Sequence, residues 1–177
     1  RKGSENKIET ELTSIFLGDV LQKEDVEKAL TSEKFTDVII ALGSRDLKRL
    51  NVRTNGTKNV VDALVRAKKK SRVSILSALG TGDSWNQLSG FNKLICKLFL
   101  RSTMQDHNAQ EKITVSSELP YHIVRAVALK DVPATGKVYN QTVGLLPNND
   151  ISRADVANYI VESLLVDKQG TSSICKG

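Results

Sequence analysis

Short apolar runs of strand length alternate with helix-like patterns along most of this chain, and this alternation restricts the folds open to it. The segment 37–42 reads Asp-Val-Ile-Ile-Ala-Leu and is closed by Gly43. A strand that is apolar almost throughout is typical of a parallel sheet with both faces covered. The apolar spacing of segment 57–69 predicts the clearest helix. The alternation therefore predicts an α/β fold, with a parallel sheet and helices on both of its faces.

The same reasoning predicts further elements on either side of these two segments. Strands are expected at 14–18, 72–77 and 121–126, with an edge strand at 139–144 and a short last strand at 172–176. Helices are expected at 23–30, at 106–117 with Asp106 or Asn108 as the cap, and at 85–104, either unbroken or broken near Ser89. A final helix opens at Ser152, because Ser152 and Asp155 match a capping pattern. No repeat or linker divides the chain, so residues 1–177 are expected to form a single domain.

Composition and charge argue against several classes of protein. The net charge of +6 would suit a nucleic-acid partner, but the basic residues are dispersed, apart from a cluster at 66–72 at the end of a predicted helix. Aromatic residues make up only 5% and form no stacking array, so no nucleic-acid partner is expected. No apolar run reaches the roughly 18–20 residues of a membrane span, so no membrane partner is expected either.

The cysteines and histidines give no sign of a metal site. Cys96 and Cys175 belong to no Cys-x-x-Cys or Cys/His cluster, and the spacing of His107 and His122 matches no common zinc-ligand pattern. Residues 1–6 are polar, and no apolar segment of a signal peptide follows them. Two free thiols and the lack of a secretory signal predict a protein of a reducing compartment, the cytoplasm.

A series of short motifs stands in the order in which they occur in a known family. The motifs are Gly-Asp-Val at 18–20, the strand and glycine at 37–43, Asn-Gly-Thr-Lys-Asn-Val-Val-Asp-Ala at 55–63, Ser77 with Gly80, the segments 107–111 and 117–125, and Ile-Ser-Arg-Ala-Asp-Val-Ala at 151–157. Together they resemble the atypical short-chain dehydrogenase/reductases, especially the NAD(P)H-binding proteins of the flavin reductase and biliverdin-IXβ reductase type. The resemblance implies a Rossmann-like, doubly wound parallel sheet that binds NADP or NAD.

The resemblance also implies a unit that the sequence does not contain. Members of the family open with a strand, a Gly-x-x-Gly-x-x-Gly turn, a helix and a second strand, roughly 30–40 residues in all. Arg1 falls about where that second strand ends. We therefore expect a Rossmann-like fold whose N-terminal β-α-β unit is missing or truncated. Strand 14–18 would then lack the neighbour that joins it to strand 37–42, and the cradle for a pyrophosphate would be lost.

The family pattern points to several cofactor-binding residues. Asp19 and Val20 stand where the family contacts the adenine, although Asp19 alternatively caps the next turn. Arg1 falls where relatives place an arginine for the 2′-phosphate of NADP, and an ordinary terminal arginine is the alternative. Arg125 belongs to a Val-Arg-Ala sequence that resembles the family's Val-Arg-Pro at a strand end. The motifs imply that the partners are a dinucleotide and a small-molecule acceptor.

The carboxyl end of strand 37–42 is a second place where a cofactor is expected to bind. In open α/β sheets, ligands lie outside the carboxyl ends of the strands. Ala41, Leu42 and Gly43 stand there, and the glycine lets the backbone approach a ribose closely; a plain strand-to-loop break is the alternative. Arg45 follows, and it either meets a phosphate or is an exposed loop arginine.

Ser77 and His107 are the candidate catalytic residues. Ser77 ends a strand at the position that resembles the family's active-site serine, and bonding to its own backbone is the alternative. The sequence at 107–111 is His-Asn-Ala-Gln-Glu where the family has Tyr-x-x-x-Lys. His107 therefore either donates a proton or is a solvated residue at a helix start.

The loss of the tyrosine bears on the reaction that the resemblance implies. It favours hydride delivery to a conjugated acceptor, such as a flavin or a tetrapyrrole, over alcohol–ketone chemistry. Flavin-reductase relatives have a histidine near the position of Ala128, and alanine replaces their proline at Ala126. The resemblance thus implies an NAD(P)H-dependent reductase of the flavin or biliverdin reductase type. A non-catalytic NAD(P)-binding sensor or scaffold is the alternative.

Overall fold

A five-stranded sheet lies at the centre of the protein, and the computed structural model describes residues 14–31, 35–43 and 51–177. The strands run in the order β1 (Asp37–Ile40), β2 (Arg72–Ala78), β3 (Tyr121–Ala126), β7 (Gly170–Lys176) and β5 (Val138–Asn140). The strands β1, β2, β3 and β7 are parallel, and β5 runs antiparallel to β7. A separate parallel pair joins β4 (Ala128–Lys130) to β6 (Asp150–Ser152). The predicted α/β fold with a parallel sheet is confirmed.

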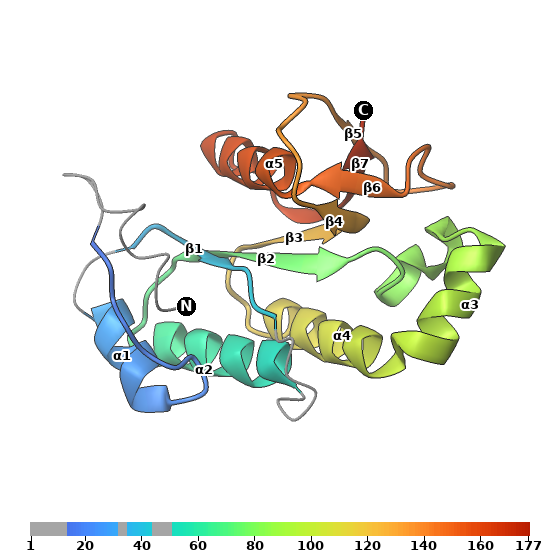
Figure 1. Cartoon of the computed structure of the whole chain (residues 1–177). Coiled ribbons are helices and arrows are strands. Elements are labelled where there is room, and N and C mark those ends of the chain that lie inside the picture. Colours follow the sequence, from blue (N-terminus) through green and yellow to red (C-terminus); the bar gives the residue numbers. More distant parts are fainter. Residues whose placement is uncertain (1–13, 32–34, 44–50) are drawn as a thin grey trace.

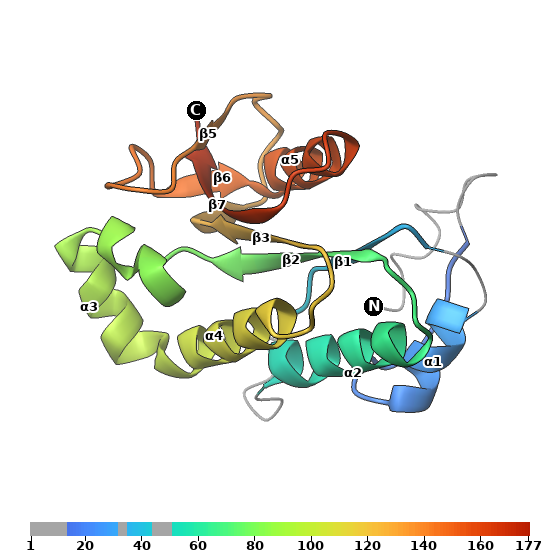
Figure 2. The same cartoon turned by 180° about the vertical axis from the view of Figure 1, so that it is seen from behind.

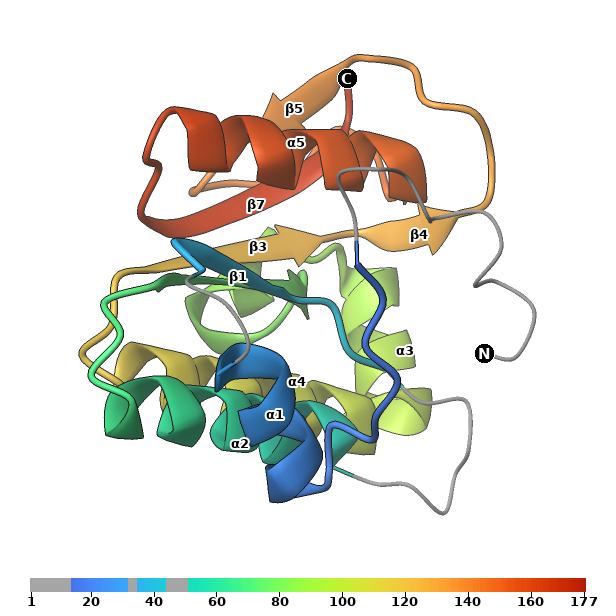
Figure 3. The same cartoon turned by 90° about the vertical axis from the view of Figure 1, so that its left-hand side faces the viewer.

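Helices cover both faces of this sheet (Figures 1 and 2). One face carries α1 (Lys23–Thr31), α2 (Val52–Arg66) and α4 (Arg101–Val115), and the other carries α5 (Arg153–Leu165), as the side view in Figure 3 shows. The 3-10 helix η2 (Gly82–Gln87) and α3 (Gly90–Phe99) extend past the carboxyl end of β2 (Figure 1). The carboxyl ends of the parallel strands are therefore directed toward α3.

Each face of the sheet buries its own apolar core. On one face Leu64 of α2 packs with Ile75 and Ile123, and on the other Val124 packs with Ile174. Successive residues of a strand point to opposite faces, so Ile123 and Val124 of β3 serve the two cores. Burial of one such side chain contributes about 1.5–3 kcal/mol, and both layers are held to the central strands in this way.

Several predicted elements agree with the structure because local signals determine them. The prediction at 121–126 coincides with β3, and the predicted edge strand is β5, although it ends at Asn140. The break near Ser89 is confirmed, since Ser89 Oγ accepts a hydrogen bond from the Asn92 N–H (3.3 Å) at the start of α3. Likewise, Ser152 Oγ accepts from the Asp155 N–H (2.9 Å) at the start of α5.

The predicted strand at 14–18 is wrong, since these residues form no strand pairing and Leu17 is exposed. Segment 37–42 is also shorter and less buried than predicted. Its strand ends at Ile40, and Ile39 is 45% exposed. The reason is that β1 lies at the edge of the sheet and pairs with β2 on one side, so the burial expected of a central strand does not occur.

The start of α2 depends on a residue far away in the sequence. The helix begins at Val52 rather than at Thr57, and its own cap residue, Asn51, makes no side-chain cap bond. Instead, the Asp106 carboxylate accepts hydrogen bonds from the backbone N–H groups of Arg53 (3.2 Å) and Thr54 (2.9 Å). The prediction that Asp106 or Asn108 caps its own helix is therefore wrong, because both lie inside α4.

Candidate functional site

A cavity of about 290 Å3 lies at the carboxyl ends of β1, β2 and β3. Its walls include residues predicted separately to bind a cofactor or to act in catalysis: Ala41, Leu42, Gly43, Ser77 and His107. These residues come from a strand end, a second strand end and a helix that are far apart in the sequence. The sheet brings them together at the edge where open α/β sheets bind ligands.

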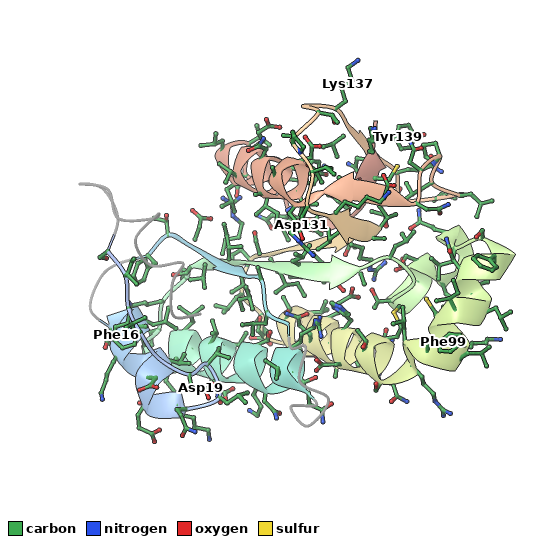
Figure 4. The ribbon with its side chains drawn as sticks, viewed as in Figure 1. Phe16, Asp19, Phe99, Asp131, Lys137 and Tyr139 are labelled. Atoms are coloured by element: carbon green, nitrogen blue, oxygen red, sulfur yellow. The ribbon has the colours of Figure 1, made fainter. Side chains whose placement is uncertain are left out.

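Asp19 and Val20 line a second cavity, of about 200 Å3, beside α1 and α2, where Figure 4 shows Asp19. The two cavities are neighbours across Gly56 of α2. A Cβ atom at Gly56 would come within 2.6 Å of Leu42 and 3.0 Å of Val20, so both side chains pack directly on the glycine. Asp19 Oδ1 accepts a hydrogen bond from the Leu21 N–H (3.0 Å), which is the turn-capping role given as its alternative.

The hydroxyl of Ser77 is held by a buried carboxylate. Ser77 Oγ donates to Glu111 Oε1 at 2.6 Å, and Thr81 Oγ1 lies 2.6 Å from the same oxygen. The alternative that Ser77 bonds to its own backbone does not describe this geometry. Since its only hydrogen is directed at Glu111, Ser77 can offer lone pairs to a ligand in the cavity, but no proton.

Glu111 is in turn fixed by Arg125. Arg125 Nε and Nη2 donate to the two carboxylate oxygens at 3.0 and 2.8 Å, and its Nη1 bonds to Asp83. Both side chains of the Glu111–Arg125 pair are 8% exposed. Burial by itself would raise the pKa of Glu111, but hydrogen bonds from Arg125, Ser77 and Thr81 outweigh it and lower that pKa. Arg125 was predicted to bind cofactor, yet it does not line the cavity and its donors hold carboxylates.

His107 is buried within α4, at 6% exposure, so the alternative of a solvated helix-start residue is wrong. Burial lowers its pKa to about 4, and the nearby Arg53 guanidinium acts in the same direction. The imidazole is therefore neutral near pH 7 and is no source of an imidazolium proton. Its Nδ1 has no hydrogen-bond partner within the part of the chain that the structure describes, and so it can meet a polar group of a ligand.

Sequence reasoning missed Arg53, which lines the same cavity in the first turn of α2. Its Nη1 lies 3.4 Å from Asp106 Oδ2, and its Nη2 lies 3.2 Å from where a Cβ of Gly43 would be. Its buried Nε has no partner among the described residues. A guanidinium at a helix N-terminus is suited to bind a phosphate or carboxylate. The available signal was the arginine at 53, but the helix start was placed too late to include it.

A third cavity, of about 320 Å3, adjoins the first and shares Ala78, Ala126 and Val127 with it. Most of its lining residues are apolar, among them Leu88 just after η2, Ile95 of α3 and Met104 of α4. A ligand at the strand ends and an apolar molecule beside it can therefore lie against the same wall.

Two predicted site residues, Arg1 and Arg45, lie outside the described residues. Among the residues that the structure does describe, no three His, Cys, Asp or Glu side chains gather as a metal-binding group. Within those same ranges, no helix has the length and apolar character needed to cross a membrane. Cys96 and Cys175 are both buried free thiols.

Comparisons with known proteins agree with a cavity at the strand ends of a Rossmann-like sheet. The NAD(P)H-binding family matches residues 2–167. An uncharacterised chloroplastic protein of Arabidopsis thaliana is 34% identical over 113 residues, and the match covers 64% of this chain but only 40% of the plant protein.

Solved structures of similar shape include dehydrogenases and reductases. Anaerobillin reductase ChuY of Escherichia coli O157:H7 is 26% identical, with a TM-score of 0.70 over 91% of this chain and 74% of ChuY. A short-chain dehydrogenase/reductase of Veillonella parvula DSM 2008, solved in complex with NADP, has a TM-score of 0.77 over 96% of this chain and 75% of its own. At 18% identity this second likeness shows the fold alone, which is the Rossmann-like α/β fold that was predicted.

Proposed function

This chain belongs to the NAD(P)H-binding family, and we propose that it is an NAD(P)H-dependent reductase that delivers hydride to a conjugated acceptor such as a flavin or a tetrapyrrole. The observation that carries this proposal is the pair of adjoining cavities at the carboxyl ends of the strands. The cavity lined by Ser77 and His107 would hold the nicotinamide end of the cofactor, and the adjoining apolar cavity would hold the acceptor against it. ChuY, a structural relative, is itself named as a reductase.

The described residues offer contacts for the adenine, a phosphate and the nicotinamide end of a dinucleotide along this edge, but they do not include the glycine-rich pyrophosphate cradle that the family pattern implies. Asp19 and Val20 would receive the adenine, and Arg53, with its unpartnered Nε, would meet a phosphate. Gly43 would let the backbone approach the ribose closely, since it has no side chain. A Cβ atom there would also lie 3.2 Å from Arg53 Nη2 and crowd that guanidinium. The buried, unpartnered Nδ1 of His107 would meet a polar group at the nicotinamide end.

The bound cofactor supplies hydride, and the chain orients both partners. Ser77 acts as a hydrogen-bond acceptor, because Glu111 takes its only hydrogen. It would therefore accept from an N–H group, such as the nicotinamide carboxamide or a ring N–H of the acceptor. His107 is neutral near pH 7 and Ser77 holds no proton to spare, so the acceptor is expected to be protonated from solvent. A conjugated acceptor spreads the charge of the transferred hydride and suits such a site.

A non-catalytic NAD(P)H sensor is the second candidate, and one observation favours it. Among the described residues that line the cavity, His107 is neutral near pH 7, so it offers no imidazolium proton for an acceptor. A protein of this kind would bind the cofactor and change its contacts with a partner, without turnover.

The experiment begins with a titration of the chain with NADPH and NADH, followed by cofactor fluorescence. Oxidation of NADPH is then measured with flavin mononucleotide and with biliverdin as acceptors. We expect binding, turnover with at least one acceptor, and about tenfold lower kcat for Ser77→Ala, which loses one hydrogen bond to the reacting partners. Ser163→Ala is the matched control, because the hydroxyl of this buried serine donates to the Tyr159 carbonyl of α5, away from the cavity.

The outcomes separate the candidates. A chain that binds neither NADPH nor NADH contradicts both the reductase and the sensor. Binding without turnover by either acceptor favours the sensor. Unchanged turnover in Ser77→Ala removes Ser77 from the site while leaving the reductase proposal in place.

A further inference from the structure

Helix α3 presents large apolar side chains to solvent along one side. Phe91 is 73% and Phe99 is 77% exposed, and Leu94 and Leu98 between them are more than half exposed. Figure 4 shows Phe99 at the outer end of the molecule. Only Cys96 of this helix is buried, so most of its apolar surface serves no core within the described chain. Patches of this kind mark interaction surfaces.

A second segment extends the same surface. The loop after β5 carries the exposed side chains of Val143 and Leu145. A hydrogen bond of 2.9 Å from Asn92 Nδ2 of α3 to Asn149 Oδ1 ties this loop to the helix. Figures 1 and 2 show the loop beside α3 from opposite sides. The term α3 face below denotes Phe91, Leu94, Leu98, Phe99, Val143 and Leu145.

The two segments of the chain that form the α3 face carry basic residues but no acidic ones. Between Asp83 and Asp106, and again between Asp131 and Asp150, the sequence has no aspartate or glutamate, although the chain has 20 such residues. The first of these stretches carries Lys93, Lys97 and Arg101. Within the described part of the chain, no carboxylate forms an ion pair with any of the three. The surface is thus both apolar and basic.

We propose that the α3 face docks on the surface of an anionic lipid bilayer. Exposed Phe and Leu side chains on one side of a helix, with Lys and Arg beside them, are the combination that inserts at the boundary of headgroups and acyl chains. The apolar side chains would enter this boundary, while Lys93, Lys97 and Arg101 meet lipid phosphates. This departs from the expectation of no membrane partner, which rested on the lack of a spanning segment.

A second copy of the chain is a poorer occupant of this face. A symmetric dimer would place the same patch against itself, so the lysines of one copy would meet those of the other, and both segments of the patch lack acidic residues. A bilayer of anionic lipid offers opposite charge and apolar depth together. Docking would also bring the apolar cavity lined by Ile95 and Cys96 of α3 close to the lipid. A lipophilic acceptor would then have a short route from the bilayer to this cavity, a point that rests on the proposed function.

The test is sedimentation of the chain with sucrose-loaded vesicles of phosphatidylcholine alone or with about 30% phosphatidylserine. We expect binding to the anionic vesicles, weakened by added salt. Phe91→Ser/Leu98→Ser and Lys93→Gln/Lys97→Gln should each weaken it about tenfold or more. Leu165→Ser is the matched control, because it removes a leucine that is even more exposed than Leu98, 82% against 64%, from the C-terminal end of α5 and should leave binding unchanged.

Three results would overturn the proposal. They are no binding to anionic vesicles, equal loss in Leu165→Ser, or a dimer in size-exclusion chromatography that Phe91→Ser/Leu98→Ser dissociates, which would assign the face to a second copy. Urea unfolding followed by the fluorescence of Trp85 shows whether the variants are folded. An NADPH titration of the same variants separates the two proposals, because the α3 face contributes no residue to the cofactor cavity.

Discussion

Glu111→Gln would remove the charge of the carboxylate that faces Arg125, and the buried guanidinium would keep only the 90% exposed Asp83 as an ionic partner among the described residues. Both side chains of the pair are 8% exposed, and Arg125 contacts both oxygens. Breaking a buried pair by removing one partner costs about 3–5 kcal/mol. We therefore expect Glu111→Gln to lower the free energy of unfolding by an amount in that range, a large part of the stability of a domain of this size.

Replacing both partners should cost far less than the two single changes together. In Glu111→Leu/Arg125→Met no buried charge is left unpaired, because Asp83, which loses Arg125, is 90% exposed. Ser77 loses its carboxylate acceptor, whereas Thr81 Oγ1 keeps the Ala78 carbonyl at 2.7 Å. At about 1 kcal/mol for a hydroxyl hydrogen bond, the double variant should be destabilised by about 1–2 kcal/mol. Asp62→Asn is the control, because it breaks an exposed pair with Lys58 worth about 0.5 kcal/mol or less.

The assay is urea unfolding followed by the fluorescence of Trp85, the one tryptophan of the chain. A loss below about 1 kcal/mol in Glu111→Gln would contradict the argument, since a broken buried pair costs several times more. So would a double variant that loses as much as the two single variants combined. The depressed pKa of Glu111 adds a pH test: its stabilisation is present above its unfolded pKa and is lost as the pH falls through the lower folded value.

Three further results are expected. Burial lowers the pKa of both His107 and His122 from 6.5 to about 4, so the unfolded chain binds more protons below pH 6.5 and stability falls on acidification. Each histidine should lower the free energy of unfolding by about 2 kcal/mol at pH 5 relative to pH 7. Urea unfolding at the two pH values should show that His122→Gln removes about half of this loss. Gly56→Ala places a Cβ 2.6 Å from Leu42 and should cost about 1–2 kcal/mol and weaken NADPH binding; unchanged affinity would show that the two cavities do not share this wall. Arg53→Met should weaken NADPH binding about tenfold, whereas exposed Arg66→Met should not; equal affinities would remove Arg53 from the phosphate site.

The parts of the fold that follow from local signals were predictable from the sequence. The apolar run of β3 and the Ser152 cap of α5 are determined by residues next to one another in the sequence, and the structure agrees with both predictions. Strand 14–18 was not, because a strand needs a partner and its apolar run does not show whether one is beside it. The start of α2 was missed for a similar reason, since its cap, Asp106, comes 53 residues after Arg53 in the chain.

The candidate site also has features that were predictable from the sequence and features that were not. That Ser77 and the segment 41–43 lie together at one cavity was predictable, because they stand at strand ends, where ligands bind in such sheets; their roles stay predictions. The roles of neighbouring side chains were not. Nothing in the local sequence shows that His107 is buried and neutral, or that Arg125 turns toward Glu111. These features depend on how α4 packs against the sheet, which only the three-dimensional arrangement determines.

The hydrogen bonds between Asp106 of α4 and the first turn of α2 couple the local unfolding of that turn to the local unfolding of α4. The amides of Arg53 and Thr54 would exchange with solvent quickly at an ordinary frayed helix end, but here they open only when α4 also moves. Arg53 and His107 flank this junction on the two helices. A ligand that binds between them would therefore suppress hydrogen exchange in both helices at once, as a single cooperative unit.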